Sequence, residues 1–219
     1  MRTFLFLLFS AFAALLVLSC SSDSNMPCIT CPQLPPEYIG GSCKIEDYGE
    51  VPIGEQIWMK KNWGCYAKGS KCYGGDSINC NKYGRLYDWA TATDTAKANR
   101  LCPAGWHLPT RSDWDKLVGF VENDSRCSDC AGYLLKAKEG WNDNSQEQSG
   151  NGIDKHDFMA LPGGLDYFLE GDYGFWWSAS EDNSKSGNAF SLYMVNYSDK
   201  SSFTSNKKAS LLSVRCLKD

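Results

Sequence analysis

The sequence predicts an α+β fold held together by disulfide bonds, and three observations support this. Two segments in the first half have apolar residues at helical spacing, the last third has apolar residues that alternate as in strands, and the chain contains 11 cysteines. Helices followed by strands favour α+β over a parallel α/β sheet, in which the two alternate. We expect two helices and small antiparallel sheets in a single domain over residues 38–219.

The composition is that of a folded, acidic protein. The chain has 219 residues, of which 42% are hydrophobic and 13% aromatic, and this excludes a disordered chain. A formal net charge of -4 argues against a nucleic-acid partner, because phosphate binding requires a basic face. So many cysteines indicate an oxidising compartment, and their odd number leaves one without a partner.

The first twenty residues predict export. Arg2 precedes an apolar run from Phe4 to Leu18 that is too short for a membrane span, so residues 1–19 are expected to be a secretory signal peptide. Ser19-Cys20 fits the bacterial lipoprotein pattern, in which the cysteine is lipidated and becomes the new N-terminus. Lipidation of Cys20 leaves ten cysteines, an even number. A plain signal peptide cleaved nearby is the alternative.

Residues 20–37 predict an extended stalk, because serines are followed by four prolines. We therefore expect a protein bound to the membrane through its lipid, in the cell envelope and most simply in the outer membrane. It would face either the periplasm or the cell surface.

The first half of the domain carries three local signals. Residues 51–59 predict a hairpin with Gly54-Glu55 at its turn. Residues 64–81 are rich in glycine and cysteine and predict a loop. Residues 82–97 predict the first helix, because four apolar side chains follow helical spacing: Tyr83, Leu86, Tyr87 and Ala90.

The second helix is expected to begin after Thr110. Asp113, three residues further on, completes a capping box in which Asp replaces Glu, and an apolar stripe starts at Trp114. Residues 133–137 are ambiguous, and residues 142–157 predict a long polar loop. Four short apolar segments then predict antiparallel strands: 158–161, 174–178, 189–197 and 211–217.

Seven blocks in order carry a family resemblance. They are Ile53 to Met59, Asn81 to Trp89, Cys102 to Pro109, Asp113-Trp114, Ala160 to Gly164, Phe175 to Glu181 and Ser213 to Cys216. Over residues 51–219 the chain resembles the Fibrobacter succinogenes major paralogous domain family of bacterial secreted proteins. The resemblance implies an exported, often lipid-anchored protein and points to no single activity.

A weaker similarity lies in the segment from Gly105 to Thr110 and the Asp-Trp pair after it. These residues are similar to C-type-lectin-like folds, including the branch of formylglycine-generating enzymes, and imply a C-type-lectin-like architecture. That enzyme branch uses a cysteine pair between its last two strands, which this chain lacks. Its oxidase activity is therefore not implied.

Sequence alone does not fix the connectivity of ten cysteines. The C-type-lectin-like resemblance implies a bond between Cys102 and Cys216. Proximity in the chain suggests three local pairs, which are Cys72 with Cys80, Cys127 with Cys130, and Cys28 with Cys31. Cys43 with Cys65 then follows by elimination. The alternatives for the two CxxC pairs are a tetrathiolate zinc site and, for Cys127 and Cys130, a redox site.

No catalytic residue or cofactor is assigned, because no serine-nucleophile, phosphate-loop or dinucleotide motif is present. His107 is expected to be structural, and His156 to be an ordinary exposed loop histidine, with a pKa raised by its acidic neighbours as the alternative. Trp141-Asn142-Asp143 copies a tripeptide that binds calcium and sugar in C-type lectins. Asp143, Ser145, Glu147 and Asp154 have a loose calcium-loop spacing, but the glycine of an EF-hand is missing.

The tryptophans suggest a ligand surface, since aromatic rings meet the flat apolar faces of sugars. Trp176 and Trp177 are adjacent, so in a strand they point to opposite faces, and we expect one in the core and the other exposed or under a loop; burial of both is the alternative. The candidate ligand residues are Trp176, Trp177, Trp141 and Asp143. The function expected is a non-enzymatic binding or adhesion module for polysaccharide or another envelope component. A surface enzyme that uses acidic residues of the 142–157 loop, and a structural envelope protein, are the alternatives.

Overall fold

The computed structural model describes residues 41–96, 100–166 and 168–219. The expected signal peptide, the stalk, Cys20, Cys28 and Cys31 lie outside the described residues. Within the described ranges, no helix is both long enough and apolar enough to cross a bilayer.

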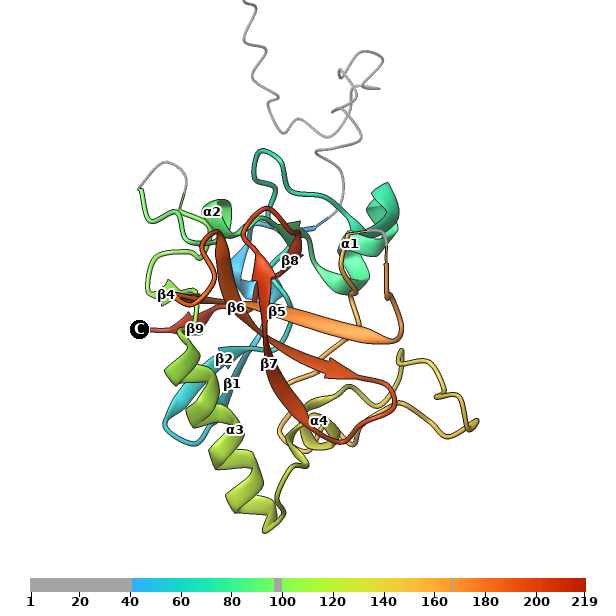
Figure 1. The fold of residues 1–219 in the computed structure, drawn as a ribbon. Helices are drawn as coiled ribbons and strands as arrows, with labels where there is room; N and C mark the ends of the chain where they lie inside the picture. Colours follow the sequence, from blue (N-terminus) through green and yellow to red (C-terminus); the bar gives the residue numbers. More distant parts are fainter. Residues whose placement is uncertain (1–40, 97–99, 167) are drawn as a thin grey trace, which may run out of the picture. The chain divides into compact units, whose positions relative to one another are not determined.

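Two small sheets organise the domain (Figure 1). One has four antiparallel strands in the order β1 (Glu50–Ile53), β2 (Gln56–Met59), β9 (Leu217–Lys218) and β4 (Trp106–His107). The other has five, in the order β3 (Leu86–Tyr87), β8 (Leu212–Ser213), β5 (Tyr173–Glu181), β6 (Asn188–Val195) and β7 (Ser201–Lys207). All of its pairs are antiparallel except β5 with β8.

The described residues form four α-helices, α1 (Ser77–Tyr83), α2 (Trp89–Ala92), α3 (Arg111–Ser125) and α4 (Ala131–Leu135), and two 3-10 helices, η2 (Ile45–Asp47) and η3 (Tyr73–Gly75). The α+β class is confirmed, with two more short α-helices than expected. The expected hairpin is also confirmed as β1 and β2.

Helix α3 begins as its sequence predicts. The Thr110 hydroxyl accepts from the Asp113 amide at 3.2 Å, and the Asp113 carboxylate accepts from the Thr110 amide at 3.0 Å. This capping box satisfies amides that the first turn of a helix leaves unpaired. Trp114, Leu117 and Val121 then pack into the core beside the β1–β2 hairpin (Figure 1).

The predicted helix over residues 82–97 is wrong. Helix α1 ends at Tyr83, and Gly84 turns the chain with a φ of 77°. A Cβ at Gly84 would meet the Trp63 carbonyl oxygen at 2.7 Å, so only glycine fits this close approach. Leu86 and Tyr87 are buried because they form β3 against β8, and this produced the spacing that resembles a helix.

The strands also differ from the expectation in three places. Residues 158–161 form no strand, and only Ala160 makes an isolated bridge, to Lys136. The segment 211–217 divides into β8 and β9, which belong to different sheets. Strand β7 was not predicted, because its seven residues contain a single large apolar side chain, Phe203.

Four disulfides join the described cysteines, in the pairs that the resemblance, proximity in the chain and elimination suggested. They are Cys43–Cys65, Cys72–Cys80, Cys102–Cys216 and Cys127–Cys130. Because Cys127 and Cys130 are bonded to each other, their thiols are not zinc ligands. The Cys102–Cys216 bond ties the segment before β4 to the segment between β8 and β9.

The core lies on both faces of β5. Trp176 packs with Leu192, Met194 and the α3 side chains on one face, whereas Phe175 and Trp177 pack with Tyr87, Leu212 and Val214 on the other. A strand covered on both faces has no solvent-exposed side near its middle.

Candidate functional site

The predicted tryptophan surface is absent. Trp176 and Trp177 point to opposite faces of β5, as expected, but both are fully buried, because a core cluster covers each face. Trp141 is buried as well, and its indole N–H donates to the Ala160 carbonyl at 2.9 Å. These three rings hold the fold together and offer no plane to a ligand.

The polar residues after Trp141 link three segments of the chain. The Asp172 carboxylate accepts from the amides of Asn142 at 3.1 Å and Asn196 at 3.0 Å. Asn196 also donates to the backbone carbonyl of Asp143 at 3.2 Å. The start of the 142–157 loop is thereby fixed to the beginning of β5 and the end of β6, while the Asp143 side chain stays exposed.

The suggested calcium spacing does not converge on a site. Asp154 is buried and accepts from the Met159 amide at 2.8 Å, whereas Asp143 and Glu147 are exposed. Burial raises the pKa of Asp154. Across the ranges that the structure describes, no group of three or more potential metal ligands is found.

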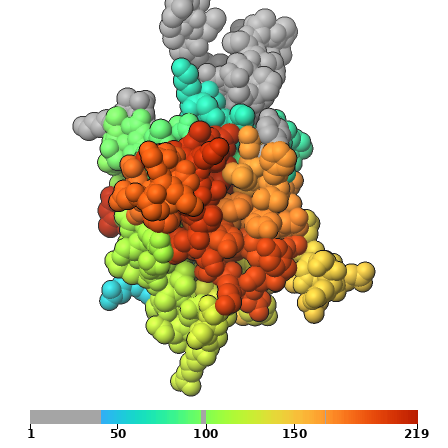
Figure 2. All heavy atoms as spheres, viewed as in Figure 1, coloured from blue at the N-terminus to red at the C-terminus, as the bar shows by residue number. Residues whose placement is uncertain are grey.

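A polar hollow of about 210 Å³ lies beside this loop. Its walls come from the loop, from α4 and from the connection between β6 and β7, and its lining residues are Tyr133, Lys136, Asn144, Gln148, Ser149, Asn151, Asn196, Tyr197, Ser198 and Asp199. In Figures 1 and 2 the loop projects as a yellow arm beside the red end of the β6–β7 hairpin. Amides, hydroxyls and two tyrosines thus meet in one concave surface.

Hydrogen bonds within the loop order these amides. The Asn144 side-chain oxygen accepts from the backbone amides of Gln146 and Gln148 at 2.9 and 3.0 Å. The Asn151 oxygen accepts from the Trp141 amide at 3.0 Å, and its nitrogen donates to the Ser149 hydroxyl at 3.1 Å. Donors and acceptors held in place in this way lose little freedom when a ligand binds.

Lys136 supplies a buried cation to the polar hollow. Its side chain is 2% exposed, and its ammonium donates to the carbonyls of Val195 and Ser198, both at 3.1 Å. Burial lowers the pKa of Lys136 to about 8, and the nearby charge of Asp199 partly opposes that shift. The same ammonium lies 5.2 Å from the centre of the Trp141 ring, so two carbonyls and an aromatic face hold this cation in place.

A row of aromatic rings continues from the polar hollow along β5 and β6. We call it the aromatic row, and it consists of Tyr197, Tyr173, Phe175 and Tyr193. The Tyr173 and Phe175 rings stack at 5.7 Å, and the Phe175 and Tyr193 rings stack at 6.0 Å. The hydroxyls of Tyr173 and Tyr197 lie 3.0 Å apart, and this hydrogen bond together with burial raises the pKa of Tyr173 to about 12.

Tyr197 belongs to both surfaces, since it lines the polar hollow and ends the aromatic row. Its side chain is 62% exposed, whereas Phe175 inside the row is 8% exposed. Tyr197 therefore joins the polar hollow to the half-buried rings of Tyr173 and Tyr193 in one continuous site, and Phe175 is the core residue that supports these rings from below. Sequence reasoning missed its members because they are ordinary core-strand and loop residues that only the β5–β6 register and α4 bring together.

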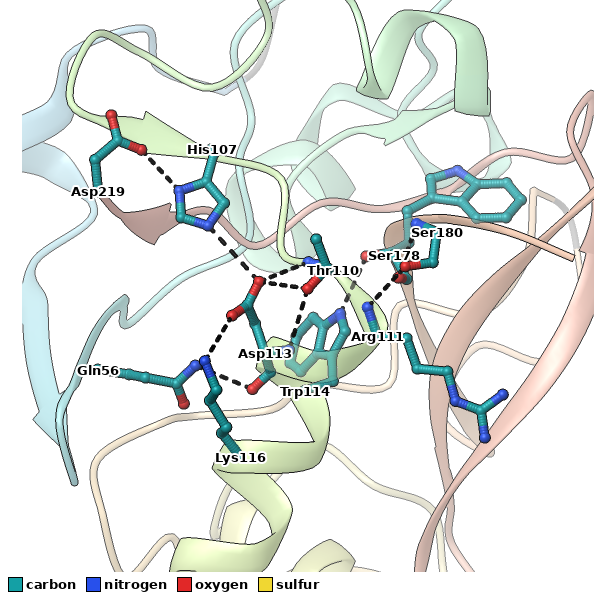
Figure 3. Close-up of polar contacts among 11 residues, drawn as sticks. Gln56, His107, Thr110, Arg111, Asp113, Trp114, Lys116, Ser178, Ser180 and Asp219 are labelled. Atoms are coloured by element: carbon teal, nitrogen blue, oxygen red, sulfur yellow. Dashed lines mark hydrogen bonds and ion pairs between the residues drawn. The ribbon is translucent and has the colours of Figure 1, made fainter.

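His107 has the structural role that the sequence predicted. Figure 3 shows its ring between two carboxylates: Nδ1 lies 2.7 Å from Asp219, and Nε2 lies 3.8 Å from Asp113. Burial acts to raise the pKa of Asp113, but hydrogen bonds from Thr110 and the charges of His107 and Lys116 hold it below its ordinary value. The cluster joins β4, residue 219 and the first turn of α3.

The expectation for His156 is wrong. Its side chain is only 14% exposed and packs edge-on against the Phe120 ring at 5.9 Å. Burial lowers the pKa of His156 and outweighs the opposing effect of Asp124. The acidic neighbours in the sequence are therefore less important than the packing of this loop on α3.

Comparisons with known proteins give one match. Neither the curated proteins nor the solved structures contain a match, so the likeness to C-type-lectin-like folds stays a prediction. A family model described as the Fibrobacter succinogenes major domain matches residues 51–218, which run from β1 to β9 and include both sheets and the site. The chain therefore belongs to the Fibrobacter succinogenes major domain family.

Proposed function

We propose that this domain is a non-enzymatic carbohydrate-binding module, and that the polar hollow and the aromatic row together form its binding surface. The observation that carries the proposal is the position of Tyr197, where a concave set of amides meets a line of rings. Sugar hydroxyls both donate and accept hydrogen bonds, as amides do, and the apolar faces of sugar rings pack on aromatic planes.

The size and charge of the site favour a neutral sugar that is part of a polymer. At about 210 Å³ the polar hollow is smaller than the ~300–1,000 Å³ that is usual for sites enclosing a small molecule. The polar hollow suits one sugar unit of a polysaccharide that continues along the aromatic row. Lys136 and Asp199 are its two charged lining residues, and their charges oppose each other.

We also propose that the protein is a lipoprotein of the cell envelope, anchored through Cys20 and placed in the outer membrane. The apolar run, Ser19-Cys20 and the proline-containing stalk support this, and so do four disulfides, which require an oxidising compartment. Mass spectrometry of the mature protein should find acyl chains on Cys20. A Cys20→Ser chain that still fractionates with membranes would contradict the anchor.

A glycan array with the mature chain carrying Cys20→Ser tests the binding function, because this chain lacks the lipid and keeps the whole domain. For each neutral polysaccharide that binds on the array, titration calorimetry then compares the affinity of this chain with that of its Tyr197→Ala variant. We expect this variant to bind at least tenfold more weakly, since the ring is lost, and to keep its stability, since the side chain is 62% exposed.

The matched control is Phe168→Ala, which removes another aromatic side chain, 69% exposed, that belongs to neither part of the site. It should bind like the parent chain. Equal affinity of Tyr197→Ala and the parent would show that the surface is wrong. No binding across the array would favour the alternatives, a surface enzyme or a structural envelope protein.

A further inference from the structure

A second concave surface, the cationic groove, lies away from the polar hollow. Two cavities of about 320 and 650 Å³ share Lys82, Met159 and Leu161 and so form one groove. No residue of the polar hollow or the aromatic row lines it. Its charged lining residues are Lys60, Lys61, Lys82, Lys138 and Arg215, with Asp47, Glu139 and Asp154. Among the described lining residues cations exceed carboxylates, although the chain as a whole carries a formal charge of -4.

Arg215 places a positive charge in the floor of the groove. Arg215 is 1% exposed, and its guanidinium donates to the side-chain oxygen of Asn62 and to backbone carbonyls of Met59, Lys60 and Phe158. Among the described residues it forms no ion pair with a carboxylate. Because buried charge is screened less than surface charge, its field reaches into the groove.

Three lysines on the rim of the groove are exposed and lack a carboxylate partner in the described part of the chain. They are Lys61, Lys82 and Lys138. Lys60 differs, because its ammonium lies 3.2 Å from the Asp157 carboxylate. The Lys82 ammonium lies over the Tyr83 ring, 4.5 Å from its centre, and this contact leaves its charge uncompensated. Lysine ammonium groups without a carboxylate partner, around a cleft whose floor holds a cation, concentrate anions at that cleft.

We propose that the cationic groove binds an acidic polysaccharide through the carboxylates of its uronic acid units. A groove made of two joined cavities suits a chain with repeated charges better than a single small anion. Met159 and Leu161, at the junction, give an apolar floor for the faces of the sugar rings.

The lining residues argue against two other anionic polymers. Single-stranded nucleic acid needs exposed aromatic rings for its bases, and among the described residues that line the groove the single aromatic one, Tyr48, is 5% exposed. Binding of an extended peptide by addition to a sheet edge is also disfavoured, because no described residue that lines the groove belongs to a strand.

Titration with polygalacturonate and with its fully methyl-esterified form tests the proposal, because the two polymers share a backbone and differ in charge. We expect the mature chain carrying Cys20→Ser to bind only the charged form, at least tenfold more weakly at 200 mM than at 50 mM salt. The double variant Lys61→Glu/Lys82→Glu should lose at least tenfold in affinity for polygalacturonate.

Lys185→Glu/Lys207→Glu is the matched control, because it changes the net charge equally at two exposed lysines outside the groove. It should retain binding. The proposal would be overturned if both double variants lost the same affinity for polygalacturonate, or if the esterified polymer bound as tightly as the charged one. It would also be overturned if polyglutamate, an acidic polymer without sugar rings, bound as tightly as polygalacturonate. Its outcome is separate from that of the polar hollow, because Tyr197→Ala should leave polygalacturonate binding unchanged.

Discussion

Asn62 and Arg215, 153 positions apart in the chain, are joined by two hydrogen bonds from the guanidinium to one side-chain oxygen, at 3.0 Å from Nε and 2.6 Å from Nη2. The same oxygen accepts from the Trp176 indole at 2.8 Å. A single buried amide thus satisfies donors from the central strand β5 and from the segment between β8 and β9. This arrangement makes Asn62 a point where the two sheets depend on each other.

Replacing Asn62 should therefore destabilise the domain strongly. Asn62→Ala leaves the buried donors of Arg215 and Trp176 without their acceptor, and we expect a loss of about 2–4 kcal/mol in the free energy of unfolding. Asn62→Asp keeps the accepting oxygen and adds a charge opposite to that of Arg215, but it loses the hydrogen bond donated to the Tyr83 carbonyl. Its free energy of unfolding should therefore lie between those of the Ala variant and the parent. Urea denaturation measures both; an Ala variant as stable as the parent would contradict the role assigned to this amide.

The disulfides should differ in their contribution to stability. In the chain-entropy model, Cys102–Cys216, with a sequence separation of 114, contributes on the order of 5 kcal/mol, and Cys72–Cys80, with a separation of 8, about 2.5 kcal/mol. Paired Cys→Ser variants compared by thermal unfolding should show the larger loss for the long loop. The reverse order would mean that native packing, and not loop closure, dominates.

Asp113→Asn tests the capping cluster of Figure 3. Since the pKa of Asp113 is lowered in the folded protein, its ionised form stabilises the fold above the unfolded pKa of about 4, and this stabilisation is lost as pH falls through the folded value. We expect the variant to be about 1 kcal/mol less stable at pH 7 and to approach the parent at strongly acidic pH. A pH-independent difference would assign the effect to packing.

Lys136→Met tests the buried ammonium. The pKa of Lys136 is lowered to about 8, so between pH 8 and pH 10 the unfolded chain binds more protons than the folded chain, and the stability of the parent should rise with pH relative to the variant. Urea denaturation at pH 7, 8, 9 and 10 gives both curves. Parallel curves would show that the ammonium is hydrated in the folded protein.

Local chemistry explains which parts of the fold could be predicted from the sequence. The turn at Gly54-Glu55 and the capping box of Thr110 with Asp113 are decided by a few neighbouring residues. The break at Gly84 could not be predicted in the same way, because it depends on the approach of the Trp63 carbonyl from a distant segment.

The features that could not be predicted from the sequence depend on contacts between distant segments of the chain. The exposure of Trp177 depends on whether Leu212 and Val214 cover that face of β5, and the polar hollow needs α4, the 142–157 loop and the β6–β7 connection together. Strand β7 is recognisable only by its register against β6, since its polar sequence is that of an edge strand.

The place of β9 has a consequence for how the chain folds as it is made. Leu217 and Lys218 follow β2 and β4 in the chain, yet β9 lies between these two strands and joins them into one sheet. A growing chain cannot complete this sheet, or close the Cys102–Cys216 bond, until residues 216–218 have been made. The strands of this sheet that are made first must therefore wait for the strand made after them, so its completion is a late step that depends on long-range pairing.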